Sequence, residues 1–310
     1  MLCRRWVITG KVVPCKRWPA KMGLDMLNLT TYAQIDQSYF EKYEEVREDK
    51  SGKRLYKYFV QTDLAQIMWK PHKFGPETND KIPQTKVDIN PKGFKSFNQL
   101  SQYLMGRFHP AEPMSLERFF ISRIDLKADV EDLPIDVVLS RLHVQGYRRD
   151  SVSLIKGRTI YIGANPKIRI YDKTAEIKAR KRKEDRKGKR RWKALLPEWD
   201  QAILESGKQI TRFEIQARNY KGTLSYLLDH YDSLVSYFDR LKFYNFEDDS
   251  KIASIMPLQL LLSKIPRKAR AQFDQFRDTE LDRRIRENFT TTSRAWFEGS
   301  DEQDTDEVPF

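Results

Sequence analysis

The sequence predicts an α+β protein with antiparallel or mixed sheets, helices on one face of the sheets, and a division into two ferredoxin-like halves. The first observation is the segment FFISRIDLKADV at residues 119–130, where apolar and charged residues alternate as they do along a half-buried strand. The second is the alternating segment TRFEIQAR at residues 211–218. The third is the pair of short strands TIYI and KIRIY, which Gly163, Asn165 and Pro166 join as a hairpin.

The other elements are predicted from apolar spacing between turn signals. Residues 1–51 mix apolar and charged residues and stay unassigned. The segment KVDINPKGF resembles RFEIQARNY, since each is a strand with a central carboxylate before a loop and a helix, which favours two related halves. We predict a strand within 53–69, a strand and amphipathic helix within 86–108, helices at 134–145, 174–186, 223–243 and 264–286, and a disordered acidic tail at 300–310.

The charge of the chain favours a polyanionic partner. Lys and Arg number 57 against 44 Asp and Glu, which leaves a net charge of +13 and a pI near 9.5. Eleven of the sixteen residues in the segment 178–193 are Lys or Arg. Such a balance is typical of proteins that bind nucleic acid or an anionic membrane surface. No apolar run is long enough to cross a membrane and no signal peptide is evident, so we expect a soluble, intracellular protein.

Several classes of site lack their sequence signatures. Only Cys3 and Cys15 are present, so neither a disulfide framework nor a cysteine zinc site is expected. The four histidines are scattered without a paired spacing, which excludes a two-histidine nuclease site. The chain has no phosphate-binding loop, no dinucleotide fingerprint and no helix-turn-helix signature.

Three alternating strands each carry one chemically useful residue on the face opposite the apolar residues. These residues are Asp125, Tyr171 and Glu214, and we expect all three to point away from the core. If the strands adjoin, two carboxylates could hold Mg²⁺ or Mn²⁺ while the tyrosine attacks a phosphodiester. Tyrosine has an ordinary pKa of about 10, so neighbouring cations would be needed to activate it. A second interpretation is that Asp125 and Glu214 only pair with Arg123 and Arg212 on a solvated face.

The segments RIDLKAD, KIRIYDKTAE and RFEIQAR, in this order, resemble the rolling-circle replication initiators of plasmids and filamentous phages, a family that includes conjugative relaxases. The resemblance covers residues 87–244 and implies that Tyr171 nicks one DNA strand, leaving a 5′-phosphotyrosine and a 3′-hydroxyl. It implies that Asp125 and Glu214 are metal ligands. Glu176 follows Tyr171 closely enough to be a third carboxylate or a partner at the start of the helix, and we expect Arg169 and Lys173 to be catalytic neighbours of Tyr171. The expected DNA-binding residues are Arg123, Arg180, Arg182, Lys183, Arg186, Lys187, Arg212 and Arg218.

The functional regions expected from these patterns are an N-terminal region at 1–51, a catalytic nicking core at 52–247, and a C-terminal basic helix with an acidic tail at 248–310. The expected partner is single-stranded or supercoiled origin DNA in the cytoplasm of a bacterial host, with a host helicase and a second copy of the chain as further candidates, and no membrane. The alternatives are a DNA-binding regulator without catalysis and a relaxase that nicks for conjugative transfer.

Overall fold

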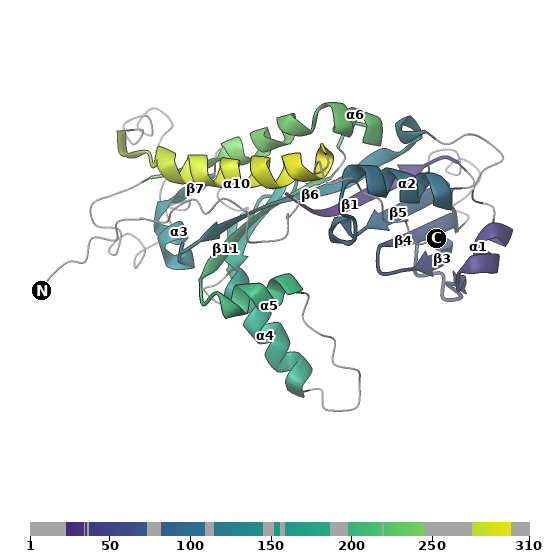
Figure 1. Ribbon diagram of the computed structural model, residues 1–310, viewed down its shortest axis with the longest axis horizontal. Helices are drawn as coiled ribbons and strands as arrows, with labels where there is room; N and C mark the ends of the chain where they lie inside the picture. The colour runs from purple at the N-terminus through teal and green to yellow at the C-terminus, as the bar shows by residue number, and fades with distance from the viewer. Residues whose placement is uncertain are drawn as a thin grey trace, which may run out of the picture. The chain divides into compact units, whose positions relative to one another are not determined.

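The computed structural model describes residues 23–33, 35, 37–72, 82–108, 115–144, 152–155, 159–186, 198–218, 220–244 and 275–298. The protein is a mixed α+β chain with a large antiparallel sheet, as the sequence predicted (Figure 1). The strand order in this sheet is β2-β3-β4-β5-β1-β6-β11-β10-β9-β8, and a separate two-stranded sheet pairs β12 with β7.

The chain divides into two compact units that are each assembled from distant stretches of sequence. In the described part of the chain, unit 1 contains residues from Lys127–Ile215 and Val235–Thr290. Unit 2 contains residues from Lys21–Leu126, Gln216–Leu234 and Thr291–Phe310. The functional boundaries expected near residues 51 and 247 stay a prediction.

Unit 2 is built around β1 (Leu24–Thr31), which sequence reasoning left unassigned. This strand pairs antiparallel with β5 (Thr85–Ile89) and with β6 (Phe120–Glu131). Leu24, Leu27 and Leu29 of β1 are fully buried. Fully burying a leucine side chain contributes about 1.5–3 kcal/mol, so this strand is a principal source of the hydrophobic core of unit 2.

The strand expected within residues 53–69 is in fact a hairpin of β3 (Tyr56–Gln61) and β4 (Ala65–Pro71), with β2 (Arg47–Glu48) on its outer edge. The turn is made by Thr62, whose Oγ1 accepts the backbone N–H groups of Leu64 and Ala65 at 3.3 and 3.1 Å. This local side-chain capping of the backbone produces a turn without the Gly or Pro that sequence reasoning looks for.

Strand β6 has the predicted alternation, but with one reversal near its start. The pairing with β1 passes from Ile121 to Arg123, so Ser122 is left unpaired as a β-bulge. The extra residue turns Ile121 inward and leaves Phe120 exposed. Regular alternation along this strand places Phe120 on the same buried face as Ile124; this expectation holds for Ile124 and is wrong for Phe120.

Two predicted helices end earlier than their apolar patterns suggested. The helix expected at 134–145 is α3 (Ile135–Arg141), because Leu142–Val144 forms β7. The helix expected at 223–243 is divided into α6 (Leu224–Asp229) and the 3-10 helix η6 (Tyr231–Arg240), followed by β12 (Leu241–Phe243). Strands β7 and β12 pair with each other, so a long-range contact overrides helical propensity at both places.

Unit 2 also contains the predicted helix α2 (Phe97–Arg107), which is capped by the side chain of Ser96. Of the basic helix predicted at 264–286, residues 279–286 belong to α10 (Thr279–Phe297), whereas residues 264–274 and the predicted acidic tail at 300–310 lie outside the described residues. The shorter elements of the chain are α1 (Gln37–Tyr43), η3 (Pro91–Gly93) and η4 (Leu116–Arg118).

Unit 1 contains the predicted hairpin of β9 (Thr159–Ile162) and β10 (Lys167–Asp172), extended by β8 (Val152–Ile155). The hairpin turn includes Gly163, whose positive φ of 74° explains the choice of glycine there. The predicted strand at 211–218 is β11 (Ile210–Arg218).

The predicted basic helix is α4 (Lys173–Arg186), which follows β10 directly. Helix α5 (Glu198–Glu205) lies beside it (Figure 1). Ile177 of α4, Ile203 of α5 and Ile210 of β11 form a buried cluster. This cluster anchors the first turns of the basic helix to the sheet.

Among the helices of the described residues, none combines the length and the apolar composition that crossing a membrane requires.

Replacing Ile203 by alanine tests the anchoring of α4 and α5. The substitution opens a cavity among Ile177, Ile210 and Leu204, so the free energy of unfolding should fall by about 2–5 kcal/mol. Urea unfolding followed by circular dichroism measures the change. Glu205→Ala on the same helix is the control, because Glu205 is exposed, and its effect should stay within about 0.5 kcal/mol. Equal effects of both substitutions would contradict the assignment.

Candidate active site around Tyr171

Tyr171 lies where strand β10 passes into helix α4, in the sequence Tyr171-Asp172-Lys173. Asp172 organises this junction, because its Oδ1 accepts the backbone N–H of Ala175 at 2.8 Å in the first turn of the helix. Its other oxygen accepts the side-chain amide of Gln209 at 3.1 Å. The Asp that follows the tyrosine is therefore a helix cap that holds Tyr171 at the strand end.

Tyr171, Arg169 and Glu214 form one contact group in unit 1. The Tyr171 hydroxyl donates to Glu214 Oε1 at 2.7 Å. Arg169 Nη1 donates to the other oxygen of Glu214 at 3.2 Å, and its guanidinium lies 4.1 Å above the Tyr171 ring. The structure thus brings together two predicted catalytic residues and one predicted metal ligand across β10 and β11.

The expectation that Tyr171 projects away from the core is wrong, because the residue is only 5% exposed. Its position along β10 is the one predicted, but Arg169 covers its ring and Glu214 binds its hydroxyl. Burial raises the pKa of the Tyr171 hydroxyl well above its ordinary value, since a buried phenolate is poorly solvated, and Arg212 opposes the rise only in part. The tyrosine at rest is therefore a neutral hydroxyl held against a carboxylate.

Arg212, expected to contact DNA from an exposed face, is 1% exposed. Its Nε and Nη2 donate to the two oxygens of Asp129, both at 2.7 Å. Burial alone would raise the pKa of Asp129, but the charge and hydrogen bonds of Arg212 outweigh burial and hold it below its ordinary value. The bidentate pair is a structural ion pair, and Asp129 is a site residue that sequence reasoning saw only as part of the polar face.

A second group of ion pairs lies at the start of α4. Lys173 Nζ donates to Glu176 at 2.6 Å, and Arg180 Nη2 donates to Asp200 of α5 at 2.6 Å. Burial and the nearby Arg212 lower the pKa of Lys173. Burial would raise the pKa of Glu176, but Lys173 and Arg180 lower it overall. Glu176 is thus paired with Lys173 and Arg180. Asp200 is a second partner of Arg180, and the sequence did not indicate this pair.

Asp125 lies in unit 2 rather than in unit 1. It is buried and forms an ion pair with Arg123, and Gln216 donates to it at 3.4 Å. Asp125 pairs with Arg123 as in the second interpretation, but it is buried and does not lie on a solvated face. Glu214 pairs with Arg169 instead of the expected Arg212.

The three carboxylates expected to bind Mg²⁺ or Mn²⁺ do not form one ligand set. Asp125, Glu214 and Glu176 each hold a basic side chain within ion-pair distance. In the part of the chain that the structure describes, no group of three or more His, Cys, Asp or Glu side chains is placed to hold a metal ion. These ion pairs compensate the charges of the carboxylates, and binding of Mg²⁺ or Mn²⁺ by them stays a prediction.

The expected DNA-binding residues differ in their surroundings. Arg182 of α4 and Arg218 of β11 are exposed, whereas Arg123 and Arg180 are half-buried in ion pairs. Lys183 and Arg186 lie within α4, and Lys187 lies outside the described residues. Lys178 and Lys181 are further exposed cations of the same helix.

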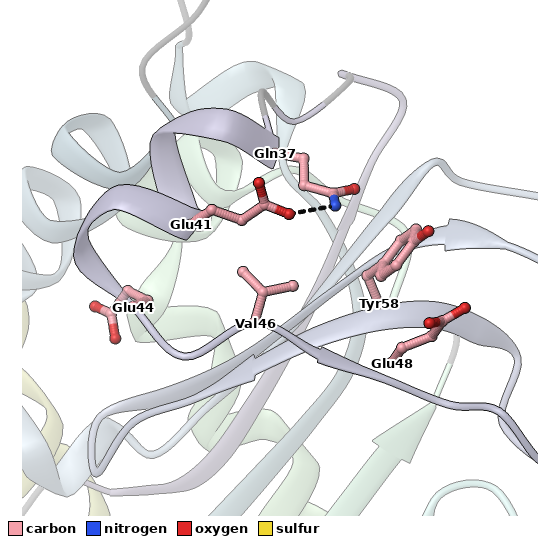
Figure 2. A pocket seen from close by; sticks show the side chains of 6 residues that line it. All are labelled: Gln37, Glu41, Glu44, Val46, Glu48 and Tyr58. Atoms are coloured by element: carbon pink, nitrogen blue, oxygen red, sulfur yellow. Dashed lines mark hydrogen bonds between the residues drawn. The ribbon is translucent and has the colours of Figure 1, made fainter.

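Unit 2 contains a cleft of about 410 Å³ between α1 and the strands β2 and β3 (Figure 2). Glu41, Glu44 and Glu48 line it together with Gln37, Val46 and Tyr58. Gln37 donates to Glu41 at 2.7 Å, Arg107 pairs with Glu44, and Lys57 pairs with Glu48 at 3.1 Å. Glu44 and Glu48 are paired with cations and Glu41 is hydrogen-bonded to an amide, so each glutamate already has a partner in the protein.

No family model, no curated protein and no solved structure matches the chain.

Replacing Asp129 by asparagine tests the buried ion pair. At pH 7 the substitution leaves the buried Arg212 without its counter-charge, so the free energy of unfolding should fall by about 3–5 kcal/mol. The pKa of Asp129 is lower in the folded protein than in the unfolded chain. The contribution of Asp129 to the free energy of unfolding is therefore complete above its unfolded pKa of about 3.9. This contribution is lost as the pH falls through the lower pKa of the folded protein.

Urea unfolding at several pH values measures both effects. The difference between wild type and Asp129→Asn should shrink as the pH is lowered from about 5 toward 3. Asp132→Asn is the matched control, because Asp132 is exposed and its positive φ of 54° suits asparagine as well as aspartate. A pH-independent difference would show that the carboxylate charge of Asp129 is not what stabilises the pair.

Proposed function

We propose that the protein is a tyrosine-nucleophile enzyme that nicks and rejoins DNA at a replication origin and so starts rolling-circle replication. The observation that carries the proposal is the hydrogen bond of 2.7 Å between the Tyr171 hydroxyl and Glu214. A nucleophile within this distance of a candidate base, with a cation on the same base, is the arrangement that nucleophilic catalysis requires. The two ferredoxin-like halves expected from the sequence remain part of this proposal.

In the nicking step, Glu214 Oε1 takes the proton of the Tyr171 hydroxyl as the phenolic oxygen attacks phosphorus. The bond between phosphorus and the 3′ oxygen breaks, and that oxygen leaves as a 3′-hydroxyl after receiving a proton. The 5′ end stays on the enzyme as a phosphotyrosine. In joining, the 3′-hydroxyl gives its proton back to the group that had protonated it and attacks phosphorus. The bond between phosphorus and the Tyr171 oxygen breaks, and Glu214 returns its proton to Tyr171.

In this scheme, Arg169 controls the access of DNA to Tyr171 and also stabilises the charge that develops during the attack. Its guanidinium covers the Tyr171 ring, yet its side chain is 39% exposed. A DNA phosphate would attract Arg169 away from the ring and would thereby uncover the tyrosine. Moving Arg169 to the phosphate would also place its charge where negative charge develops during attack.

Lys173 is the candidate proton donor for the leaving 3′ oxygen. It begins α4 two residues after Tyr171 and is buried. Burial lowers its pKa, which makes an ammonium group a better proton donor near neutral pH. Whether the reaction needs Mg²⁺ or Mn²⁺ is left to experiment, because the expected ligands do not form a group of three around one point in the described residues.

Replacing Tyr171 by phenylalanine tests the nucleophile. The variant should form no covalent adduct with single-stranded oligonucleotides that tile the replicon encoding the chain, because the attacking oxygen is gone. It should bind the same DNA as tightly as wild type, since Phe keeps the ring beneath Arg169. Adducts are detected on denaturing gels after incubation with Mg²⁺, with Mn²⁺ or with a chelator.

Tyr161→Phe is the matched control, because Tyr161 lies on the neighbouring strand and its ring also contacts Arg169, at 6.0 Å. This variant should form adducts as wild type does. In the same assay, Glu214→Gln should slow adduct formation by roughly 10²–10⁴-fold if Glu214 is the base. Adducts that persist in Tyr171→Phe would assign the nucleophile elsewhere.

A DNA-binding regulator without catalysis is the second candidate, and the burial of Tyr171 favours it. In that case the hydrogen bond between Tyr171 and Glu214 would only hold β10 against β11. Absence of any adduct, together with intact DNA binding, would support this function.

A conjugative relaxase would share the chemistry at Tyr171 but act on a transfer origin. A host helicase or a second copy of the chain would then be partners to seek.

Replacing Lys181 and Arg182 of α4 by alanine tests the binding of this helix to DNA. Both residues are exposed, and removing one cation that binds a phosphate should reduce the slope of log K against log salt by about 0.9 on duplex DNA. The expected change for both is therefore about 1.8, equal on origin and random sequences. Replacing the exposed Lys50 and Lys53 of unit 2 is the control and should leave the slope unchanged. An unchanged slope in the α4 variant would show that these two side chains do not bind phosphate.

A further inference from the structure

Unit 2 presents three neighbouring aromatic side chains to solvent. Tyr32 is 54% exposed, Phe120 is 46% exposed and Tyr226 is 47% exposed. They make up most of the five large hydrophobic side chains that are exposed within the described residues. Single exposed aromatics are normal on protein surfaces, but a group of them marks a site of interaction.

Backbone pairing brings together the segments that carry the three rings. Tyr32 and Phe120 pack edge to face with ring centroids 6.3 Å apart. Phe120 forms a β-bridge with Thr223, and the flanking Ile121 N–H donates to Gly222 O at 3.0 Å. Thr223 in turn caps α6, accepting the backbone N–H of Tyr226 at 3.2 Å. The rings therefore stand on hydrogen-bonded backbone rather than on a loop without partners.

Phe120 faces solvent because of the backbone geometry of strand β6. The bulge at Ser122 turns Ile121 and Phe119 inward and leaves Phe120 outside. The Tyr226 ring stacks on His230, which caps the end of α6, with ring centroids 4.1 Å apart. Both rings keep one face or edge available to a ligand.

The charges on these segments complement phosphate groups. Arg118 precedes Phe120 by two residues, and Lys221 precedes Thr223 by two residues; both are exposed. Arg218 at the end of β11 is a third exposed cation, and Glu117 and Asp229 are exposed carboxylates on the same segments. Cations thus outnumber carboxylates along the chain segments that carry Phe120 and Tyr226.

We propose that Tyr32, Phe120 and Tyr226 form a stacking platform for the bases of single-stranded nucleic acid, with Arg118 and Lys221 holding the phosphates. Aromatic rings interleaved with cations bind single strands without reading sequence, because every base has a face that can stack. Bases in a duplex are already stacked and cannot reach the rings. The choice of DNA as the nucleic acid rests on the proposed function, whereas the platform itself rests on the geometry of unit 2.

The test uses full-length Tyr171→Phe protein, so that no covalent adduct forms, and a fluorescein-labelled oligothymidylate of about 15 nucleotides. Phe120→Ala and Tyr226→Ala should each weaken binding of the oligothymidylate by about 5- to 150-fold in fluorescence anisotropy. Binding of a duplex should not change. Phe120→Tyr should bind the oligothymidylate as the parent does, because it retains a ring.

Leu55→Ala is the control, because Leu55 is 45% exposed in the same unit but is not aromatic. It should leave binding unchanged. Photocrosslinking with 5-iodouracil in the oligonucleotide, mapped by mass spectrometry, should attach to at least one of the three rings. Unchanged single-strand affinity in both alanine variants would overturn the proposal.

Two further outcomes distinguish the stacking platform from a protein interface and from the nicking function. If the alanine substitutions dissolve an oligomer in sedimentation experiments without changing DNA affinity, the patch is a protein interface and the proposal is wrong. If oligothymidylate binding depends on the rings although wild-type protein forms no adduct, the platform stands and only the nicking function fails.

Discussion

The guanidinium of Arg212 is the charge on which the organisation of unit 1 depends. It is buried on β11 and held by both oxygens of Asp129 on β6. A buried cation is tolerated only with such compensation, since removing it from water costs several kcal/mol. Its field also reaches the groups around it: it adds to burial in lowering the pKa of Lys173, helps to lower that of Glu176, and opposes the burial-driven rise at Tyr171.

The same arrangement creates a tension between stability and catalysis at Tyr171. Hydrogen bonding to Glu214 and covering by Arg169 make the tyrosine a well-packed residue. Burial keeps its hydroxyl neutral, although a nucleophile needs to lose its proton. In the proposed function, the carboxylate that stabilises the resting state also accepts that proton, and catalysis requires DNA to displace Arg169.

Unit 2 shows how a one-residue irregularity in a strand changes a surface. The bulge at Ser122 moves Phe120 from the core side to solvent and keeps Ile121 buried. Bulges bend strands and redirect side chains, and they are enriched near functional surfaces. The exposed rings of Phe120, Tyr32 and Tyr226 are grouped because strand, turn and helix cap meet there through backbone hydrogen bonds.

Local patterns in the sequence were enough to predict the α+β class, the hairpin before Tyr171, the strand β11 and the basic helix α4. Period-two alternation and turn residues act over a few positions, so they can be read without knowledge of the rest of the chain. For the same reason the sequence predicted which polar residues share the face of Tyr171.

Only the tertiary structure decided the partners and the exposure of those residues. Alternation assigns a side chain to a face of a sheet, but it cannot say whether another element covers that face. Arg212 pairs with Asp129 rather than Glu214, and Tyr171 is buried, because of neighbours distant in sequence. Strand β1 and the β7–β12 pair were likewise decided by long-range pairing, whose free energy exceeds the small local propensities that a sequence displays.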